Sequence, residues 1–230
     1  MAFINSKNKE IQVKIVYYGP GRSGKTTNLE YIYNKFGSRI NSEMVSVKAH
    51  GDRTLFFDFL PMDISLIGGY TVKIQLYTVP GQVKYNATRR MVLRGVDGIV
   101  FVADAIAIRR EKNIQSLMNL QENLAHHKIQ LEKIPYVFQY NKIDLKRQDI
   151  ALTPLNVLNQ DLNKNTKKPA FPASAIRGVN VAATLKKIIS MTVASIRRDL
   201  KQKALIDSRT EQKQCVRHGD GKRINCWGSI

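Results

Sequence analysis

Residues 19–26 form a glycine-rich segment that reads G-x-x-x-x-G-K-T. The residues before it, 11–18, are rich in branched and aromatic side chains, as strands are. After it, apolar side chains recur at helical spacing as far as Phe36. A glycine-rich turn between a strand and a helix predicts a phosphate-binding loop, because glycine lets backbone amides at a helix N-terminus approach an anion closely. A flexible turn without a ligand is the weaker alternative.

The expected contacts follow from the chemistry of such loops. Lys25 would reach the β- and γ-phosphates of a nucleotide, and the Thr26 hydroxyl would bind Mg²⁺. The loop amides would point toward phosphate oxygens. The predicted phosphate-binding residues are Gly19, Gly21, Arg22, Ser23, Gly24, Lys25, Thr26, Thr27 and, later in the chain, Gly81.

The composition suits one domain with an extension. The chain has 230 residues, of which 43% are hydrophobic, enough to bury a core. Its apolar runs are shorter than the ~20 residues that span a bilayer, and its N-terminus lacks the apolar centre of a signal peptide. Both cysteines, Cys215 and Cys226, lie near the C-terminus, which predicts a core without disulfides and a cytoplasmic location.

The net charge is +19, from 37 basic and 18 acidic residues. Such a balance favours acidic partners, which include anionic lipid head groups, nucleic acid and acidic protein surfaces. The charge does not choose among them, and a basic surface without a specific target remains an equal alternative.

Hydrophobic patterning along the chain predicts an α/β fold. Short apolar runs at 96–103 and 136–140 are typical of strands buried on both faces, and they alternate with helical patterns. A run at 54–60 and an alternating run at 70–77 flank two glycines that suit a hairpin turn. We therefore expect a mostly parallel central sheet with one antiparallel hairpin strand and helices on both faces.

The domain boundary is expected near residue 200. Residues 1–200 would form the domain, with residues 1–10 as an arm and 38–53 as a loop. An apolar stripe predicts a long last helix from Val181 to Leu200. Residues 201–230 are basic and lose this pattern, which predicts a largely disordered tail. A helix continued to about Asp207 is the alternative.

A second motif, N-K-x-D at residues 141–144, follows an apolar strand. The Asp144 carboxylate can accept hydrogen bonds from the ring N–H and the exocyclic amine of guanine, whereas adenine would present an acceptor to it. The aliphatic part of Lys142 can lie over the base. The predicted guanine-binding residues are Asn141, Lys142, Asp144, Ser174, Ala175 and Ile176.

A third motif, Thr78-Val79-Pro80-Gly81-Gln82, ends the alternating strand. Gly81 is placed to give its amide to a γ-phosphate, and Gln82 is placed to orient an attacking water. A Pro-Gly turn followed by a solvated glutamine is the alternative for this segment taken alone.

Together and in this order, the three motifs resemble those of the small Ras-like GTPases. Two longer segments, residues 50–61 (HGDRTLFFDFLP) and 76–89 (LYTVPGQVKYNATR), are similar to the bacterial MglA group of gliding-motility and cell-polarity switches. The resemblance extends over roughly residues 7 to 200 and does not include the tail. It implies a Ras-like phosphate-loop G domain that uses Mg²⁺ with GTP and GDP.

The resemblance also implies roles for residues near 54. Thr54 would be the switch threonine that contacts Mg²⁺ and the γ-phosphate, and Arg53 would be an arginine finger supplied by the protein itself. Such roles suit phosphoryl transfer, whose catalysis is mainly positioning and neutralisation of charge. Thr78 departs from most Ras relatives, which carry aspartate there, but it matches the MglA group. This departure leaves the rate of turnover open.

The implied function is a GTP-hydrolysing switch that controls polarity or motility through an effector bound in the GTP state. The implied partners are an MglB-like Roadblock-domain activating protein and a response-regulator-type polarity protein. The basic tail would contact anionic membrane, no specific nucleic acid is expected, and the protein would be cytoplasmic with recruitment to a cell pole. A nucleotide-bound scaffold with negligible turnover is the alternative, and an ATPase or kinase is disfavoured because N-K-x-D has no role there.

Overall fold

The computed structural model describes most of the chain. Its described residues are 3–5, 7–36, 45–49, 53–67, 70–82, 85–148 and 150–217. Side chains are not described for residues 3, 4, 45–49, 53–67, 147 and 203–217. The glycines expected to turn the hairpin at 68–69 lie outside the described residues.

The strands form one sheet in the order β3-β4-β5-β2-β6-β7-β8, with β1 paired to β2. The strands are β1 (Phe3–Asn5), β2 (Glu10–Tyr18), β3 (Val45–Ala49), β4 (Arg53–Ile67), β5 (Tyr70–Thr78), β6 (Gly98–Asp104), β7 (Tyr136–Asn141) and β8 (Ala170–Pro172). Five neighbours, β5, β2, β6, β7 and β8, run parallel, which confirms the predicted parallel core. β4 pairs antiparallel with β5, and Met62 lies opposite Ile74.

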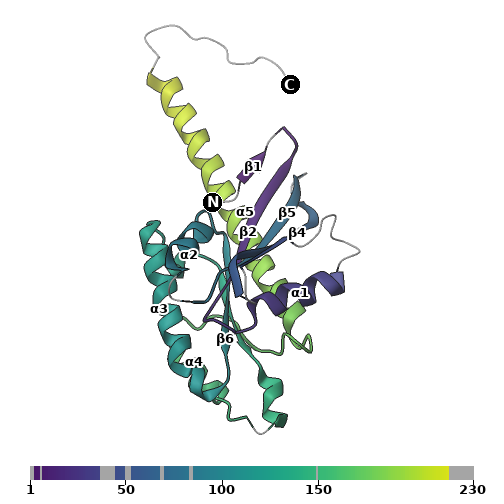
Figure 1. Cartoon of the computed structure of the whole chain (residues 1–230). Coiled ribbons are helices and arrows are strands. Elements are labelled where there is room, and N and C mark those ends of the chain that lie inside the picture. Colours follow the sequence, from purple (N-terminus) through teal and green to yellow (C-terminus); the bar gives the residue numbers. More distant parts are fainter. Residues whose placement is uncertain are drawn as a thin grey trace. The chain divides into compact units, whose positions relative to one another are not determined.

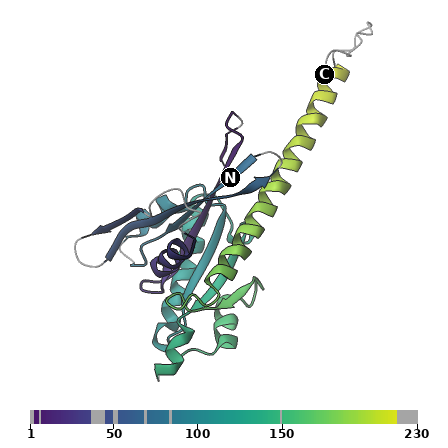
Figure 2. The same ribbon diagram turned by 90° about the vertical axis from the view of Figure 1, so that its right-hand side faces the viewer.

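Helices lie on both faces of this sheet (Figure 1). They are α1 (Lys25–Phe36), α2 (Asn86–Leu93), α3 (Arg110–His126), α4 (Leu155–Leu162) and α5 (Val181–Arg217), with short 3₁₀ turns η3 (Ala107–Arg109), η4 (Leu131–Lys133) and η5 (Ile143–Gln148). α2, α3 and α4 lie on one side, and α1 and the start of α5 lie on the other, which faces the viewer in Figure 2.

The two-sided burial explains the composition of the central strands. All seven residues of β6 and all six of β7 are buried. Phe101 and Phe138 pack edge to face, with ring centroids 5.7 Å apart, in a cluster that includes Leu120 and Leu124 of α3. Such largely apolar strands are stable here because helices exclude water from both faces.

Two segments form strands that the sequence patterns did not predict. β3 pairs antiparallel with β4, so the expected loop at 38–53 is wrong for residues 45–49. β1 pairs antiparallel with β2, so part of the expected N-terminal arm belongs to the sheet. Both are short edge segments, whose pairing depends on a neighbouring strand more than on their own side chains.

The last helix is longer than expected. α5 begins at Val181, as the apolar stripe predicts, but it continues to Arg217. The expectation of disorder from residue 201 is therefore wrong for residues 201–217, because lysine, glutamine and arginine form helices readily once an apolar stripe has started one. The chain divides into two compact units, Met1–Thr192 and Val193–Ile230, and the described part of the second is helical. None of the helices among the described residues has the length and apolarity to cross a membrane.

The parallel core places the motifs at one edge of the sheet. β2, β5, β6, β7 and β8 end at Tyr18, Thr78, Asp104, Asn141 and Pro172. Their carboxyl ends lie on the same edge, which is where open α/β sheets bind ligands. The phosphate loop, the P-G-Q segment and both guanine segments follow these ends.

Candidate functional site

The phosphate loop has a backbone that its glycines make possible. Gly19 and Gly24 have φ angles of +145° and +96°, and Arg22 has φ +63°. A Cβ on Gly19 would overlap the carbonyl oxygen of Val102, and one on Gly24 would overlap the Asn141 amide. The loop therefore lies tightly against β6 and β7, and α1 begins at its last residues, which aims helix N–H groups at the loop.

Lys25 is held over the loop that precedes it. Its side chain is 7% exposed, and its Nζ donates to the carbonyl oxygens of Gly19 at 3.0 Å and Pro20 at 2.7 Å. Burial without these acceptors would strongly disfavour an ammonium group. The loop carbonyls thus keep a cation where the phosphates of a nucleotide are expected.

Asn141 connects the phosphate loop to the guanine segments. Its side chain is 2% exposed, its Nδ2 donates to the Ser23 carbonyl at 2.7 Å, and its Oδ1 accepts from the Ala175 N–H at 2.8 Å. The Asn141 amide thus pairs with two segments that lie far apart in the sequence. These contacts bring the first and last predicted segments of the site together.

The turn at Ser174–Val179 carries the last guanine-binding residues. Ser174 and Val179 exchange backbone hydrogen bonds of 3.2 and 2.9 Å. Gly178 has φ +71°, and a Cβ there would overlap the ring of Tyr31 from α1. Ala175 is buried, whereas the side chain of Ile176 is 76% exposed, so the turn offers its backbone, rather than the Ile176 side chain, to a base.

Lys142 and Asp144 follow directly on β7. Lys142 has φ +75°, which turns the chain sharply after the strand, and its Nζ donates to Asp104 Oδ2 at 2.7 Å. Asp144 lies in η5 with a partly exposed side chain. The lysine is therefore fixed by an ion pair, and Asp144 follows it by two residues.

The P-G-Q segment lies against the phosphate loop. A Cβ on Gly81 would overlap the backbone of Gly21, so these two glycines are in direct contact. Arg89 of α2, which is 6% exposed, donates from Nη1 to the carbonyl oxygen of Gln82 at 2.8 Å and approaches that of Pro80 at 3.4 Å. Arg89 thus holds the backbone of the predicted catalytic residue.

A polar network continues from Arg89 to α3. Asn86 accepts hydrogen bonds from Arg89, Asn119 and Asn123 at 3.3, 3.1 and 2.9 Å. The Tyr18 hydroxyl donates to Asn119 at 2.7 Å, and burial raises the pKa of Tyr18 to about 12, so it remains a donor at neutral pH. The start of α2 is therefore tied to β2 and α3.

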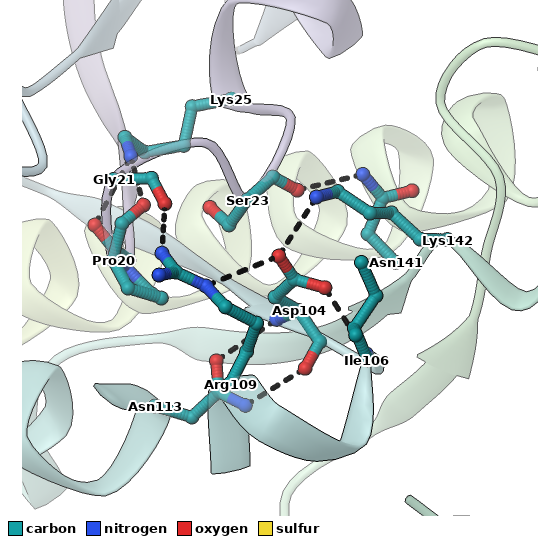
Figure 3. A network of polar contacts seen from close by, with 11 residues as sticks. Pro20, Gly21, Ser23, Lys25, Asp104, Ile106, Arg109, Asn113, Asn141 and Lys142 are labelled. Carbon is teal, nitrogen blue, oxygen red and sulfur yellow. Dashed lines mark hydrogen bonds and ion pairs between the residues drawn. The ribbon is translucent and has the colours of Figure 1, made fainter. Parts of the chain in front are cut away.

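Asp104, which the sequence patterns did not single out, links the two halves of the site (Figure 3). It ends β6 and is 1% exposed. Its carboxylate pairs with Lys142 and with Arg109, whose Nη2 donates to the Gly21 carbonyl at 2.5 Å. A carboxylate that directly follows a run of apolar residues at the end of a parallel strand is a signal that could have identified it.

Four further predicted site residues are Thr26, Thr27, Arg53 and Thr54. Thr26 and Thr27 lie in the first turn of α1 with partly exposed side chains. Arg53 and Thr54 open β4, opposite Ala49 and Lys48 of β3, and their side chains lie outside the described residues.

Comparisons with known proteins agree with this geometry. The model of the Ras family matches residues 14–194. The chain is 48% identical over 198 residues to the Mutual gliding-motility protein MglA of Myxococcus xanthus, covering 86% of this chain and 99% of that protein. It is 25% identical to the Ypt/Rab-type GTPase YPT7 of Saccharomyces cerevisiae, covering 80% of this chain and 83% of that one.

A human relative, ADP-ribosylation factor-like protein 4A, is also 25% identical, covering 78% of this chain and 82% of its own. The family model accounts for most of the described chain, and the relative at 48% identity is aligned over nearly its whole length. The chain therefore belongs to the Ras family of small GTPases.

Proposed function

We propose that this GTPase is a molecular switch that binds GTP and GDP through the residues predicted from its motifs. The observation that carries the proposal is the position of Asn141, whose amide joins the phosphate loop to the Ser174–Val179 turn. A guanine nucleotide would lie across this junction, with its phosphates on the residue 19–27 segment and its base between Lys142 and Asp144. The side chain of Asn141 would thus support both the segment that binds the phosphates and the segment that binds the base.

Hydrolysis would take place where Gly81 contacts Gly21. Gly81 would donate its N–H to the γ-phosphate, and Gln82 would orient the water that attacks the γ-phosphorus. The bond from phosphorus to the bridging oxygen then breaks, and GDP keeps that oxygen. Arg53 would neutralise charge on the transferred group, and Thr54 would contact the γ-phosphate. The contact of Gly81 with Gly21 supports this arrangement.

The donor set fits a magnesium ion bound together with nucleotide. Among the residues whose side chains are described, no group of three or more His, Cys, Asp or Glu could hold a metal ion by itself. This agrees with a nucleotide site, because Mg²⁺ there takes few protein ligands besides phosphates and water. Thr26, next to Lys25 at the start of α1, and Thr54 would hold it. When bound, Mg²⁺ neutralises phosphate charge during the reaction.

The cellular role is proposed from the relative at 48% identity, which is named a gliding-motility protein. The GTP state would bind an effector that controls cell polarity or motility. A Roadblock-domain protein would activate hydrolysis, and a response-regulator-type polarity protein would be a second partner. The protein would work in the cytoplasm and at a cell pole.

The base specificity can be tested at Asp144. We expect Asp144→Ala to weaken GTP binding by about 2–4 kcal/mol, because two guanine donors lose a charged acceptor. We expect Asp144→Asn to shift preference toward xanthine nucleotides, whose acceptor suits an amide donor. Titration of fluorescent GTP, XTP and ATP analogues measures both effects.

Asp161→Ala is the matched control for this test. Asp161 is paired with Arg110 on the surface, and its loss should leave all three affinities unchanged. If Asp144→Ala binds GTP as tightly as the parent does, the guanine assignment of residues 141–144 is wrong.

The basic C-terminal segment is proposed to contact anionic membrane. Deletion of residues 201–230 should leave nucleotide binding and hydrolysis intact, because residues 1–192 form a compact unit. It should weaken sedimentation with vesicles containing anionic lipid, since each Lys or Arg near such a surface contributes about 1 kcal/mol. The loss should shrink as salt rises.

Vesicles of neutral lipid serve as the control for this deletion. Equal binding of the two proteins to anionic vesicles would reject the membrane role. Loss of nucleotide binding would instead show that the deleted residues support the GTPase unit.

A further inference from the structure

Three consecutive backbone carbonyl groups of the phosphate loop accept hydrogen bonds from positively charged side chains. Lys25 holds the Gly19 and Pro20 carbonyls, and Arg109 holds the Gly21 carbonyl. Lys25 is part of the G-x-x-x-x-G-K-T motif, whereas Arg109 comes from η3, which follows β6. Arg109 therefore contacts the phosphate loop although it lies outside the G-x-x-x-x-G-K-T motif.

Arg109 is itself held in place by Asp104. The Nε of Arg109 lies 3.7 Å from Asp104 Oδ2, and the guanidinium lies between that carboxylate and the Gly21 carbonyl (Figure 3). Asp104 is fixed in turn, because its backbone N–H and C=O exchange hydrogen bonds with the Asn113 amide, both at 2.9 Å. Its Oδ1 accepts from the Ile106 N–H at 3.1 Å.

The bond to Gly21 fixes the direction of one loop amide. A trans peptide is planar, so its N–H points opposite to its carbonyl. With the Gly21 carbonyl turned toward Arg109, the N–H of Arg22 points to the other side of the peptide. Arg22 has φ +63°, which continues the concave run of amides that binds anions.

We propose that Asp104 and Arg109 are positioning residues that orient the Gly21–Arg22 peptide for the phosphates of the nucleotide. The same carboxylate holds Lys142, the residue expected over the base. One buried carboxylate therefore sets both the phosphate side and the base side of the site. This inference rests on the proposed nucleotide site and names two residues outside its motifs.

The test compares Arg109→Ala with Arg110→Ala in the full-length protein. Arg110 is the neighbouring arginine, but it pairs with Asp161, at 2.7 Å, on the protein surface. We expect Arg109→Ala to speed dissociation of fluorescent GDP and GTP by about tenfold, as for one lost hydrogen bond to a charged group. Arg110→Ala should dissociate both nucleotides at the parent rate.

Two further variants separate positioning from general stability. Arg109→Lys keeps the charge with a single-point donor and should recover part of the loss, whereas the shorter amide of Arg109→Gln ends near the position of the arginine Nε and should recover less. Arg109→Ala should keep the parent ratio of GTP to ATP affinity. Its melting temperature without nucleotide should stay near that of the parent, while the increase caused by GDP becomes smaller.

Parent dissociation rates in Arg109→Ala would overturn the proposal. A faster rate that Arg109→Lys does not partly restore, together with a lowered melting temperature without nucleotide, would also overturn it, because the residue would then be structural. The proposed function fails separately: if the parent protein binds GTP no better than ATP, the guanine site is wrong whatever Arg109 does.

Discussion

Gln82→Leu should slow hydrolysis of preloaded GTP by about 10²–10³-fold when an activating partner is present, while GTP affinity stays near that of the parent. The proposed role of Gln82 is to orient the attacking water, which matters in the transition state and not in the bound ground state. The size is that seen when one preorganised donor to a transition state is removed. Single-turnover hydrolysis with a Roadblock-domain protein measures the rate, and a separate titration measures affinity.

Arg53→Ala should also slow GTP hydrolysis, and the decrease in rate should be largest when the activating partner is present. An arginine finger on a segment that must first close should contribute less at rest than one supplied in trans, which speeds GTP hydrolysis by Ras about 10³–10⁵-fold. Gln121→Leu, which changes an exposed glutamine of α3, is the control and should hydrolyse at the parent rate. Parent rates in both Gln82→Leu and Arg53→Ala would show that the catalytic roles are wrong.

Asn141→Ala should weaken binding of GDP and GTP together by about 10²-fold or more. The change leaves the buried Ser23 carbonyl and the Ala175 N–H without their partner, and each such group costs about 1–3 kcal/mol. The two segments that it joins would then have to be ordered by the nucleotide itself. Asn141→Asp keeps the acceptor for Ala175 but turns a negative charge toward the Ser23 carbonyl, so it should be no better.

Titration of fluorescent nucleotides and thermal unfolding together measure this effect. Asn159→Ala is the matched control, because Asn159 of α4 accepts a 2.7 Å hydrogen bond from the hydroxyl of Tyr140 in β7 and, among the described residues, its side chain is hydrogen-bonded to neither Ser23 nor Ala175. It should lower the melting temperature without changing affinity. If Asn141→Ala keeps the parent affinity, the amide does not support the nucleotide site.

The local chemistry of the site could be predicted from the sequence because it is carried by contiguous residues. Glycines at 19 and 24 have the positive φ angles that the loop requires, and Lys25 follows them at the start of α1. The parallel core was also predictable, because unbroken apolar runs such as β6 need cover on both faces. Edge pairing of β1 and β3 was not, since short strands are fixed by their neighbours.

What the tertiary structure decided is how distant polar residues pair around those motifs. Asp104, Arg109 and Arg89 are ordinary charged residues in the sequence of a very basic chain, and their spacing follows no binding motif. Burial gives them their roles, because a charge removed from water must be paired, and the partners available are loop carbonyls and Lys142. The motifs determined which ligand the chain can bind, and the fold decided which side chains hold the motifs in place.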